Sequence, residues 1–324
     1  MILGTNLLDL MDGIVLDNEV IVASKKVVTL EVAENIKATI ETLNDTINAM
    51  YEQCKVATTF DEVLEKNKNN IKKLNDAIQL KDINIKPEKG YIRGYWNGEQ
   101  LFYVSLGNAK LAPDAHGNGF MIWSIVGKIT CNGKTELCSK NCYNCSKSFE
   151  NNIKSKIRNA IFAQMDCFED AMVKVAKMTP YAKNTYFRIH EDGDFYNVGY
   201  TQRWFNIAEK LENEKIKFMA YTKEPSLLTQ INAINAQHKN VMLRFSVMED
   251  TDAEIKAYIK ENEVPVFMCL GTQKITARST SASAKATIKL FNMVNPLNRC
   301  MDNCAMCKKC YYTGIKTVVT KMHS

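Results

Sequence analysis

The sequence predicts an α/β protein: a partial (β/α) barrel of parallel strands, preceded by a mainly helical module and followed by a cysteine-rich segment. Three observations support this prediction. Residues 30–80 show the apolar spacing of amphipathic helices, apolar runs alternate with helical patterns from about residue 90, and eight cysteines form two groups. We therefore expect three units, at residues 1–90, 91–299 and 300–324 of the 324-residue chain.

The N-terminal module is expected to form two helices packed as a hairpin. Short β-leaning runs at residues 13–17 and 20–23 come first. Apolar residues then recur at the three-to-four spacing of one helix face, at Ile36, Ile40, Leu43, Ile47 and Met50. The run 58–62 interrupts this pattern and offers a threonine cap, so we expect a second helix to begin there.

The central unit is expected to alternate strands with helices. Apolar runs predict strands at residues 120–126, 185–189, 216–221, 241–247 and 264–269. Helical patterns separate them at residues 149–178, 200–211, 226–236 and 252–260. This alternation predicts right-handed βαβ units and a parallel sheet. An open doubly wound sheet fits the same pattern as a partial barrel.

Two groups of four cysteines indicate a metalloprotein. They are Cys131, Cys138, Cys142 and Cys145, and Cys300, Cys304, Cys307 and Cys310, and each group contains the spacing C-x3-C-x2-C. Thiolates this close in sequence converge on one soft metal more readily than they form disulfides. We interpret Cys54 and Cys167 as core residues, whereas Cys269, at a strand end, fits either a core or a reactive role.

Spacing leaves three uses of these cysteines open. In the first, Cys138, Cys142 and Cys145 hold one iron–sulfur cluster and the C-terminal four hold a second. In the second, the two groups share fewer clusters, with Cys131 or a terminal cysteine completing the first site. In the third, C-x2-C pairs build a tetrahedral zinc site. Zinc ribbons favour a glycine near their C-x2-C pairs, and neither C-x3-C-x2-C run contains one, so iron–sulfur is the preferred interpretation.

Polar side chains stand where several predicted strands end. They are His190, Glu191, Asp192, Asp194, Lys223 and Ser246. Because the carboxyl ends of parallel strands share one edge, we expect these residues near the first cysteine group. The acidic cluster with His190 is a candidate catalytic site, although a solvated turn with Asp194 as a helix cap is the structural alternative. Lys223 and Ser246 can equally satisfy loop backbone groups.

Composition and charge indicate a cytoplasmic protein. No apolar run approaches the length of a membrane helix, and the N-terminus lacks a signal pattern. Eleven cysteines without a secretion signal favour a reducing compartment. The net charge of +6 permits nucleic-acid binding but also fits an ordinary solvated surface. Lys308, Lys309, Tyr311 and Tyr312 interleave cations with aromatic rings, which suits either single-stranded nucleic acid or the tuning of a cluster.

The order of strand, C-x3-C-x2-C, helix and strand with a polar turn resembles the start of a radical S-adenosylmethionine (radical SAM) enzyme. This resemblance implies a [4Fe–4S] cluster on Cys138, Cys142 and Cys145, with one iron open to S-adenosylmethionine. It places the turn 191–194, with Glu191 and Asp194, against the cofactor and implies an external electron donor. Asn144 stands where that superfamily usually has an aromatic residue.

A second resemblance covers about residues 104–312. The segments 104–111, 131–143, 187–195 and 218–223, together with the terminal cysteines, are similar to the phage and plasmid family called gene product 88. In that family Cys131 and the last three cysteines are as characteristic as Cys138 and Cys142, whereas Cys145 is additional here. The resemblance implies the ligands and the fold rather than a reaction.

Together these expectations describe an iron–sulfur protein of a mobile element. The leading function is a radical SAM-like enzyme of unknown substrate. The competing function is a non-catalytic accessory protein that binds nucleic acid and is stabilised by an iron–sulfur or zinc site. The two differ at the metal, because an enzyme leaves one iron without a protein ligand and responds to S-adenosylmethionine.

Overall fold

The computed structural model describes residues 19–21, 27–108, 111, 117–142, 150–181, 183–271, 281–301, 304–312 and 314–321. Its strands are β1 (Glu19–Ile21), β2 (Val27–Thr29), β3 (Asn84–Glu88), β4 (Tyr91–Trp96), β5 (Glu99–Ser105), β6 (Gly119–Trp123), β7 (Thr185–Ile189), β8 (Ile216–Thr222), β9 (Val241–Val247), β10 (Val266–Leu270) and β11 (Thr317–Lys321). Its α-helices are α2 (Leu30–Gln53), α3 (Phe60–Ala77), α4 (Glu136–Lys140), α5 (Glu150–Phe162), α6 (Phe168–Lys177), α7 (Val198–Lys210), α8 (Pro225–Leu228), α9 (Ile231–Gln237), α10 (Ala253–Glu261), α11 (Ala282–Met293) and α12 (Cys304–Cys307). Single 3-10 turns occupy Leu80–Asp82, Pro296–Asn298 and Lys309–Tyr311.

Nine strands form one open sheet in the order β11-β10-β9-β8-β7-β6-β5-β4-β3. Strands β6 to β11 are parallel and follow one another in chain order, whereas β3 to β6 pair antiparallel. The α/β class and the parallel sheet are therefore confirmed. The sheet does not close into a barrel, and because the parallel strands never reverse their order, it is not doubly wound.

The predicted strands correspond to β6–β10, but four further strands extend the sheet beyond the predicted ones. The three antiparallel strands β3–β5 join it on one side, and β11 joins it after the C-terminal cysteines. The predicted helix 149–178 is two helices, α5 and α6. Arg203 donates to the carbonyl groups of Ala163 and Met165, between the two helices, at 2.7 and 2.8 Å. The predicted helix 226–236 is also two, α8 and α9. The predicted run 13–17 lies outside the described residues.

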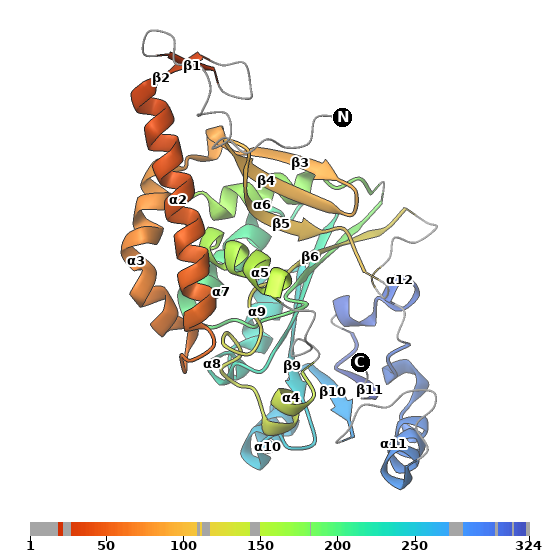
Figure 1. Cartoon of the computed structure of the whole chain (residues 1–324). Coiled ribbons are helices and arrows are strands. Elements are labelled where there is room, and N and C mark those ends of the chain that lie inside the picture. The colour runs from red at the N-terminus through yellow and green to blue at the C-terminus, as the bar shows by residue number, and fades with distance from the viewer. Residues whose placement is uncertain are drawn as a thin grey trace.

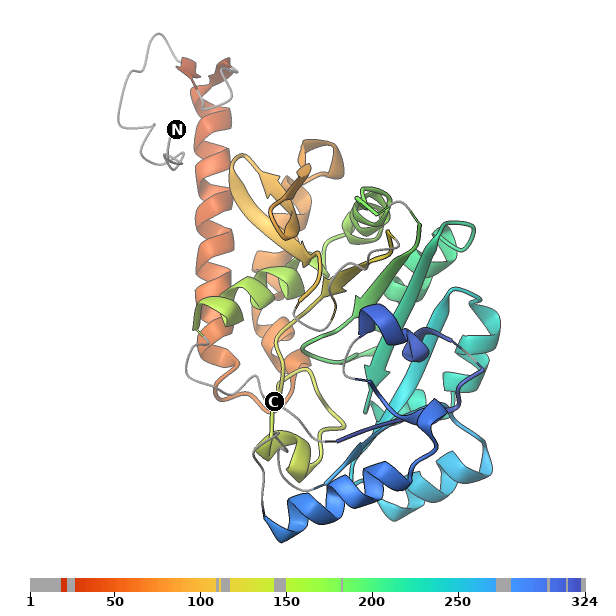
Figure 2. The same cartoon turned by 90° about the vertical axis from the view of Figure 1, so that its right-hand side faces the viewer.

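Different elements pack on the two faces of the parallel sheet (Figure 1). Helices α5, α6, α7 and α9 pack on one face, as right-handed crossovers between neighbouring strands require. Side chains such as Phe187, Phe218 and Phe245 point into that core. The other face carries Phe120, Ile122, Tyr186 and Met219, and Tyr311 of the C-terminal segment packs against them. Figure 2 shows this segment crossing the front of the sheet.

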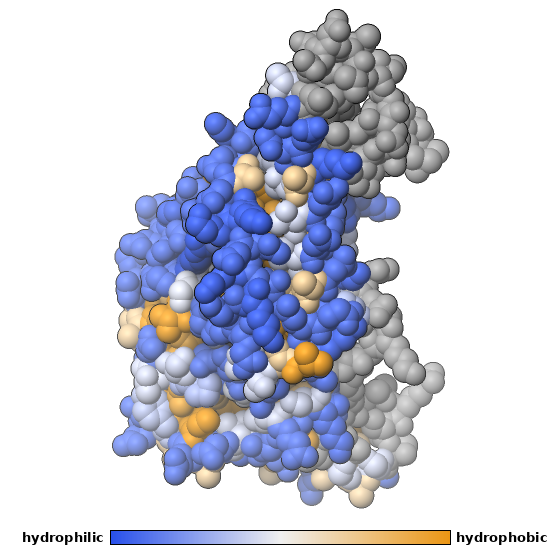
Figure 3. All heavy atoms as spheres, turned by 60° about the vertical axis from the view of Figure 1, so that its left-hand side comes forward, coloured by the Kyte–Doolittle hydropathy of each residue, from blue (hydrophilic) through white to orange (hydrophobic). Residues whose placement is uncertain are grey.

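The N-terminal helices form the predicted hairpin and pack on the same core as the sheet. Thr59 caps α3 by accepting from the Glu62 amide at 3.3 Å, and the Glu62 carboxylate accepts from the Thr58 amide at 3.2 Å. Buried residues of both helices, among them Ile40 and Phe60, belong to the main core. Their outer face is largely hydrophilic (Figure 3). Within the described part of the chain no helix is long and apolar enough to cross a membrane.

One buried amide joins the helical layer to the sheet. Asn159 of α5 is fully buried, and its side chain accepts from the Tyr103 amide at 2.9 Å. It also donates to the carbonyl groups of Tyr103 at 3.0 Å and Ser124 at 2.9 Å. Tyr103 lies on β5 and Ser124 follows β6, which pair at Ser105 and Ile122. Asn159 therefore links the antiparallel and parallel parts of the sheet.

We expect Asn159→Ala to lower the free energy of unfolding by about 2–4 kcal/mol, because it leaves buried backbone groups of both strands without partners. Chemical denaturation monitored by circular dichroism measures this change. Asn48→Ala is the matched control, since Asn48 is exposed and accepts one hydrogen bond from Lys154. Equal effects of the two substitutions would contradict the linking role of Asn159.

Candidate functional site

The first cysteine loop lies across the carboxyl ends of β8 and β9. A side chain at Gly133 would meet the carbonyl oxygen of Lys223 at 1.6 Å, so the loop backbone touches the end of β8 directly. The Leu137 amide donates to the Asp250 carboxylate at 2.7 Å, which fixes the loop to the residues after β9. Thr135 caps α4 by accepting from the Cys138 amide at 3.2 Å. The loop is thus held in place by contacts with two strand ends.

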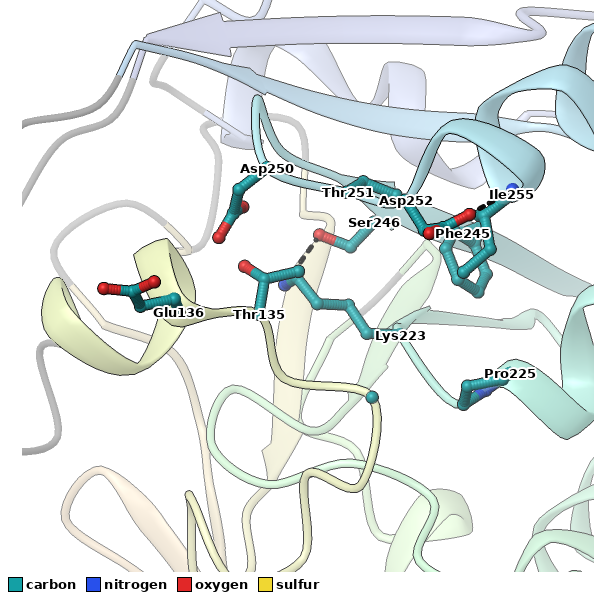
Figure 4. Close-up of a pocket in the computed structure, with 11 residues that line it drawn as sticks. Thr135, Glu136, Lys223, Pro225, Phe245, Ser246, Asp250, Thr251, Asp252 and Ile255 are labelled. Atoms are coloured by element: carbon teal, nitrogen blue, oxygen red, sulfur yellow. Dashed lines mark hydrogen bonds between the residues drawn. The ribbon is translucent and has the colours of Figure 1, made fainter.

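A cavity of about 330 Å³ opens beside this loop (Figure 4). Its lining comes from the loop, from the residues after β8, from the last residues of β9 and from the segment that leads into α10: Gly133, Thr135, Glu136, Lys223, Pro225, Phe245, Ser246, Asp250, Thr251, Asp252 and Ile255. The Lys223 ammonium donates to the Ser246 hydroxyl at 3.1 Å, and Figure 4 shows this pair between the strand ends. The cavity therefore presents one cation and several carboxylates to a ligand.

Asp194 fixes the position of Lys223. The Asp194 carboxylate is buried and accepts from the amides of Lys223 at 2.8 Å and Phe195 at 2.7 Å. Burial raises its pKa to about 6, while these hydrogen bonds act in the opposite direction. Asp194 thus connects the turn after β7 to the end of β8, next to the cavity.

Cys131 and Cys269 both lie within electrostatic range of Lys223 and of Cys138. Burial raises the pKa of Cys131 to about 12, with Asp194 and Cys138 adding to the rise and Lys223 opposing it. Burial likewise raises the pKa of Cys269 to about 11, and Lys223 and Cys138 act on it as well. Cys269 therefore lies near the first cysteine group. Its place at a strand end had left open whether it was a core residue or a reactive one.

The other members of the acidic turn form buried contacts away from the cavity lining. The His190 ring packs edge-on against Phe195, and its Nε2 lies 2.8 Å from the Tyr200 hydroxyl. Burial lowers the pKa of His190 to about 3, so the ring is neutral at physiological pH. Asp192 forms a buried ion pair with Lys156, and Glu191 accepts from the Asn108 amide group. These contacts are structural, but the expected solvated turn with Asp194 as a helix cap is wrong, because His190, Asp192 and Asp194 are buried and Asn197 caps α7.

The C-terminal cysteines lie on the open face of the sheet. Cys304 and Cys310 pack against the apolar cluster that contains Phe120 and Tyr186. The Tyr221 hydroxyl of β8 donates to the Cys310 sulfur at 2.8 Å. Lys308, between Cys307 and Cys310, adopts the left-handed conformation (φ 51°) that usually favours glycine. A glycine is therefore not needed for this turn, and its absence does not separate zinc from iron–sulfur.

A fully buried arginine, Arg244, anchors the C-terminal cysteine segment. The sequence alone did not reveal this contact. Arg244 of β9 donates to the main-chain oxygens of Lys309, Cys310, Tyr312 and Lys316, at 3.4, 3.1, 2.9 and 3.2 Å respectively. Burial lowers its pKa, and Cys310 and Tyr221 act in the opposite direction. The signal available in the sequence is one cation inside the apolar run VMLRFSV.

The donor chemistry of both groups fits a soft metal, although the side chains as described are not gathered around one point. In the part of the chain that the structure describes, no three His, Cys, Asp or Glu side chains converge closely enough to hold an ion. Cys145 lies outside that part. Cys138 and Cys142 flank the end of α4, Cys304 and Cys307 bound the single turn of α12, and Cys300 precedes it.

A protein-family model described as gene product 88 matches residues 100–313 of the chain. The chain belongs to the gene product 88 family. This confirms the family resemblance proposed from the sequence, and the matched region contains both cysteine groups and the cavity. Comparison with curated proteins and with solved structures gave no match.

We expect Gly133→Ala to displace the cysteine loop, because the new methyl group would overlap the Lys223 carbonyl. Relief of such an overlap costs about 1–3 kcal/mol. Alkylation of Cys131 in metal-free protein, followed by mass spectrometry, should become severalfold faster. Gly199→Ala is the control, since its nearest neighbour is Asn197 at 3.7 Å. An unchanged alkylation rate in Gly133→Ala would mean that this contact does not hold the loop.

Stability should fall on acidification because of His190. Its pKa is depressed to about 3 in the folded state, so the unfolded chain binds the proton more readily as pH falls below about 6.5. Between pH 7 and pH 5 this linkage lowers the free energy of unfolding by roughly 2 kcal/mol. His190→Asn, which tolerates the positive φ of 65°, should remove that part of the pH dependence in urea titrations. Parallel pH profiles of the two proteins would contradict this prediction.

Proposed function

We propose that this gene product 88 protein is an iron–sulfur enzyme of the radical SAM type, with its reaction at the carboxyl edge of the parallel sheet. The observation that carries the proposal is the placement of the first cysteine loop beside a cavity at that edge. Parallel α/β enzymes bind their ligands at the carboxyl ends of the strands. The sequential order of the parallel strands is also the order found in a (β/α) barrel, although this sheet stays open.

At the carboxyl edge of the sheet, we assign some residues to binding the cluster and others to binding the organic ligand. Cys138, Cys142 and Cys145 would hold the cluster, which when bound and reduced supplies the electron that cleaves S-adenosylmethionine. An electron-donor protein is therefore a proposed partner. Lys223 and Ser246 would bind a carboxylate or hydroxyl of the ligand, because both line the cavity and contact each other at 3.1 Å.

Carboxylates that line the same cavity could bind a positively charged group of the ligand. Glu136 and Asp250 line it from the loop and from the end of β9. A zwitterionic ligand with an ammonium and a carboxylate group would find complementary charges on the two sides. Asp194 would act by positioning Lys223 through its amide rather than by contact with the ligand.

A second candidate function is a non-catalytic accessory protein that binds single-stranded nucleic acid. One observation favours it: the exposed ring of Tyr312 lies 4.4 Å from the Lys217 ammonium, beside the C-terminal cysteines. Lys308 lies 5.4 Å from the ring of Tyr186 on the same face of the sheet, where it adds a cation, since the Tyr186 ring itself is buried. In proteins that bind single-stranded nucleic acid, cations contact the phosphates and exposed aromatic rings stack on the bases.

Metal analysis and spin resonance test the enzymatic proposal. We expect anaerobically purified protein to contain roughly four or eight irons per chain with matching sulfide. The spectrum of the reduced protein should change when S-adenosylmethionine is added. Cys138→Ser should abolish that change while Cys310→Ser retains it, since only the first group lies beside the cavity.

Other outcomes would overturn the proposal. Zinc in place of iron, or iron whose spectrum ignores S-adenosylmethionine, would rule out the radical enzyme. Oligonucleotide binding that weakens with salt and with Tyr312→Ala would then favour the accessory function.

A further inference from the structure

The environment of the C-terminal cysteines contains a buried positive charge without an acidic partner. Arg244 is fully buried, and all four of its hydrogen bonds go to main-chain carbonyl groups. No carboxylate of the described ranges forms an ion pair with it. Carbonyl oxygens satisfy the donors of a guanidinium, but they do not cancel its charge. Because arginine stays protonated, an uncompensated charge here would cost several kcal/mol.

The same environment contains a buried donor without an acceptor. The Tyr311 hydroxyl is buried and has no hydrogen-bond partner among the described residues. Tyr311 follows Cys310 directly and packs in the same cluster as Cys304. The neighbouring Tyr221 hydroxyl donates to the Cys310 sulfur at 2.8 Å. Two tyrosine donors therefore border the cysteines, and one of them still lacks an acceptor.

A second arginine adds to the positive charge. Arg188 of β7 lies 5.2 Å from the ring of Tyr221, on the face of the sheet that the C-terminal segment covers. Its Nε donates to the main-chain oxygen of His190 at 3.2 Å. Arg188 and Arg244 thus approach the cysteine segment from strands on either side of β8.

We infer that Arg244 is the internal counter-charge of an anionic metal–thiolate centre formed by Cys304, Cys307 and Cys310, with Tyr311 donating a hydrogen bond to one of its sulfurs. This inference rests on the proposal that the cysteines ligate metal, and it holds for iron–sulfur and for zinc. A centre with four thiolates, Cys300 being the fourth, has a net charge of about −2 with either. Such a centre compensates the buried guanidinium and supplies the missing acceptor.

The test isolates the C-terminal centre in the full chain. In a Cys138→Ser background, the anaerobically loaded protein is mixed with a chromogenic chelator and the release of metal is followed. We expect Arg244→Met to release metal at least tenfold faster, and Arg244→Lys, which keeps the charge, to release it more slowly than Arg244→Met. Tyr311→Phe keeps the packed ring and should still accelerate release. Arg158→Met is the control, because Arg158 pairs with Glu99 far from these cysteines.

A second measurement separates the counter-charge from a simple anchor. In a chain with Cys304, Cys307 and Cys310 all replaced by Ser, Arg244→Met should lower the free energy of unfolding only through the loss of the four main-chain hydrogen bonds, because the buried charge has no anionic partner there. In the loaded wild-type chain the same substitution should lower it by more, because the counter-charge is lost as well. Equal destabilisation in both chains, or release at the wild-type rate in both Arg244→Met and Tyr311→Phe, would overturn this inference alone. Wild-type protein without metal would overturn the proposed function as well.

Discussion

The need to cover both apolar faces of the parallel sheet determines where the helices and the C-terminal cysteine segment lie. Strands β6 to β10 follow one another in chain order, and right-handed crossovers then bring α5 to α9 to one face. The opposite face carries apolar residues such as Phe120 and Met219 that those helices cannot reach. The C-terminal segment supplies the cover, with Tyr311 in the apolar cluster and β11 added to the sheet edge. The cysteine-rich segment is therefore part of the sheet's packing rather than an appended tail.

The two cysteine groups share a spacing but have different surroundings. The first lies at the carboxyl edge of the strands, next to Lys223, the buried carboxylate of Asp194 and a cavity open to a ligand. The second lies on the sheet face and is held by Arg244 and Tyr221, away from the residues that line the cavity. The described cysteines of both groups are half-buried, so the groups differ in their neighbours: Lys223 and a cavity for the first, an arginine and apolar rings for the second.

His190 shows how a dense titratable cluster can serve folding. Its backbone has a φ of 65° and its amide donates to the Trp123 carbonyl, so the residue ends β7 and starts the turn. The ring then packs on Phe195 and Tyr200, where burial keeps it neutral. Asp194, from the same turn, is the member that reaches the cavity region, through the amide of Lys223. Position relative to the sheet, and not charge density, separates these roles.

The sequence by itself determined the helical hairpin, the five central strands, the family and the two cysteine groups, because each leaves a local signal: apolar periodicity, capping threonines or ligand spacing. It did not reveal the break between α5 and α6, since apolar periodicity continues through it and the carbonyl groups there are satisfied by Arg203, which is distant in sequence. Only the tertiary structure placed Cys269 beside the first group and Arg244 beneath the second. Both placements depend on which strands become neighbours and which segment covers the open face, and those contacts join residues too far apart in the chain to leave a local pattern.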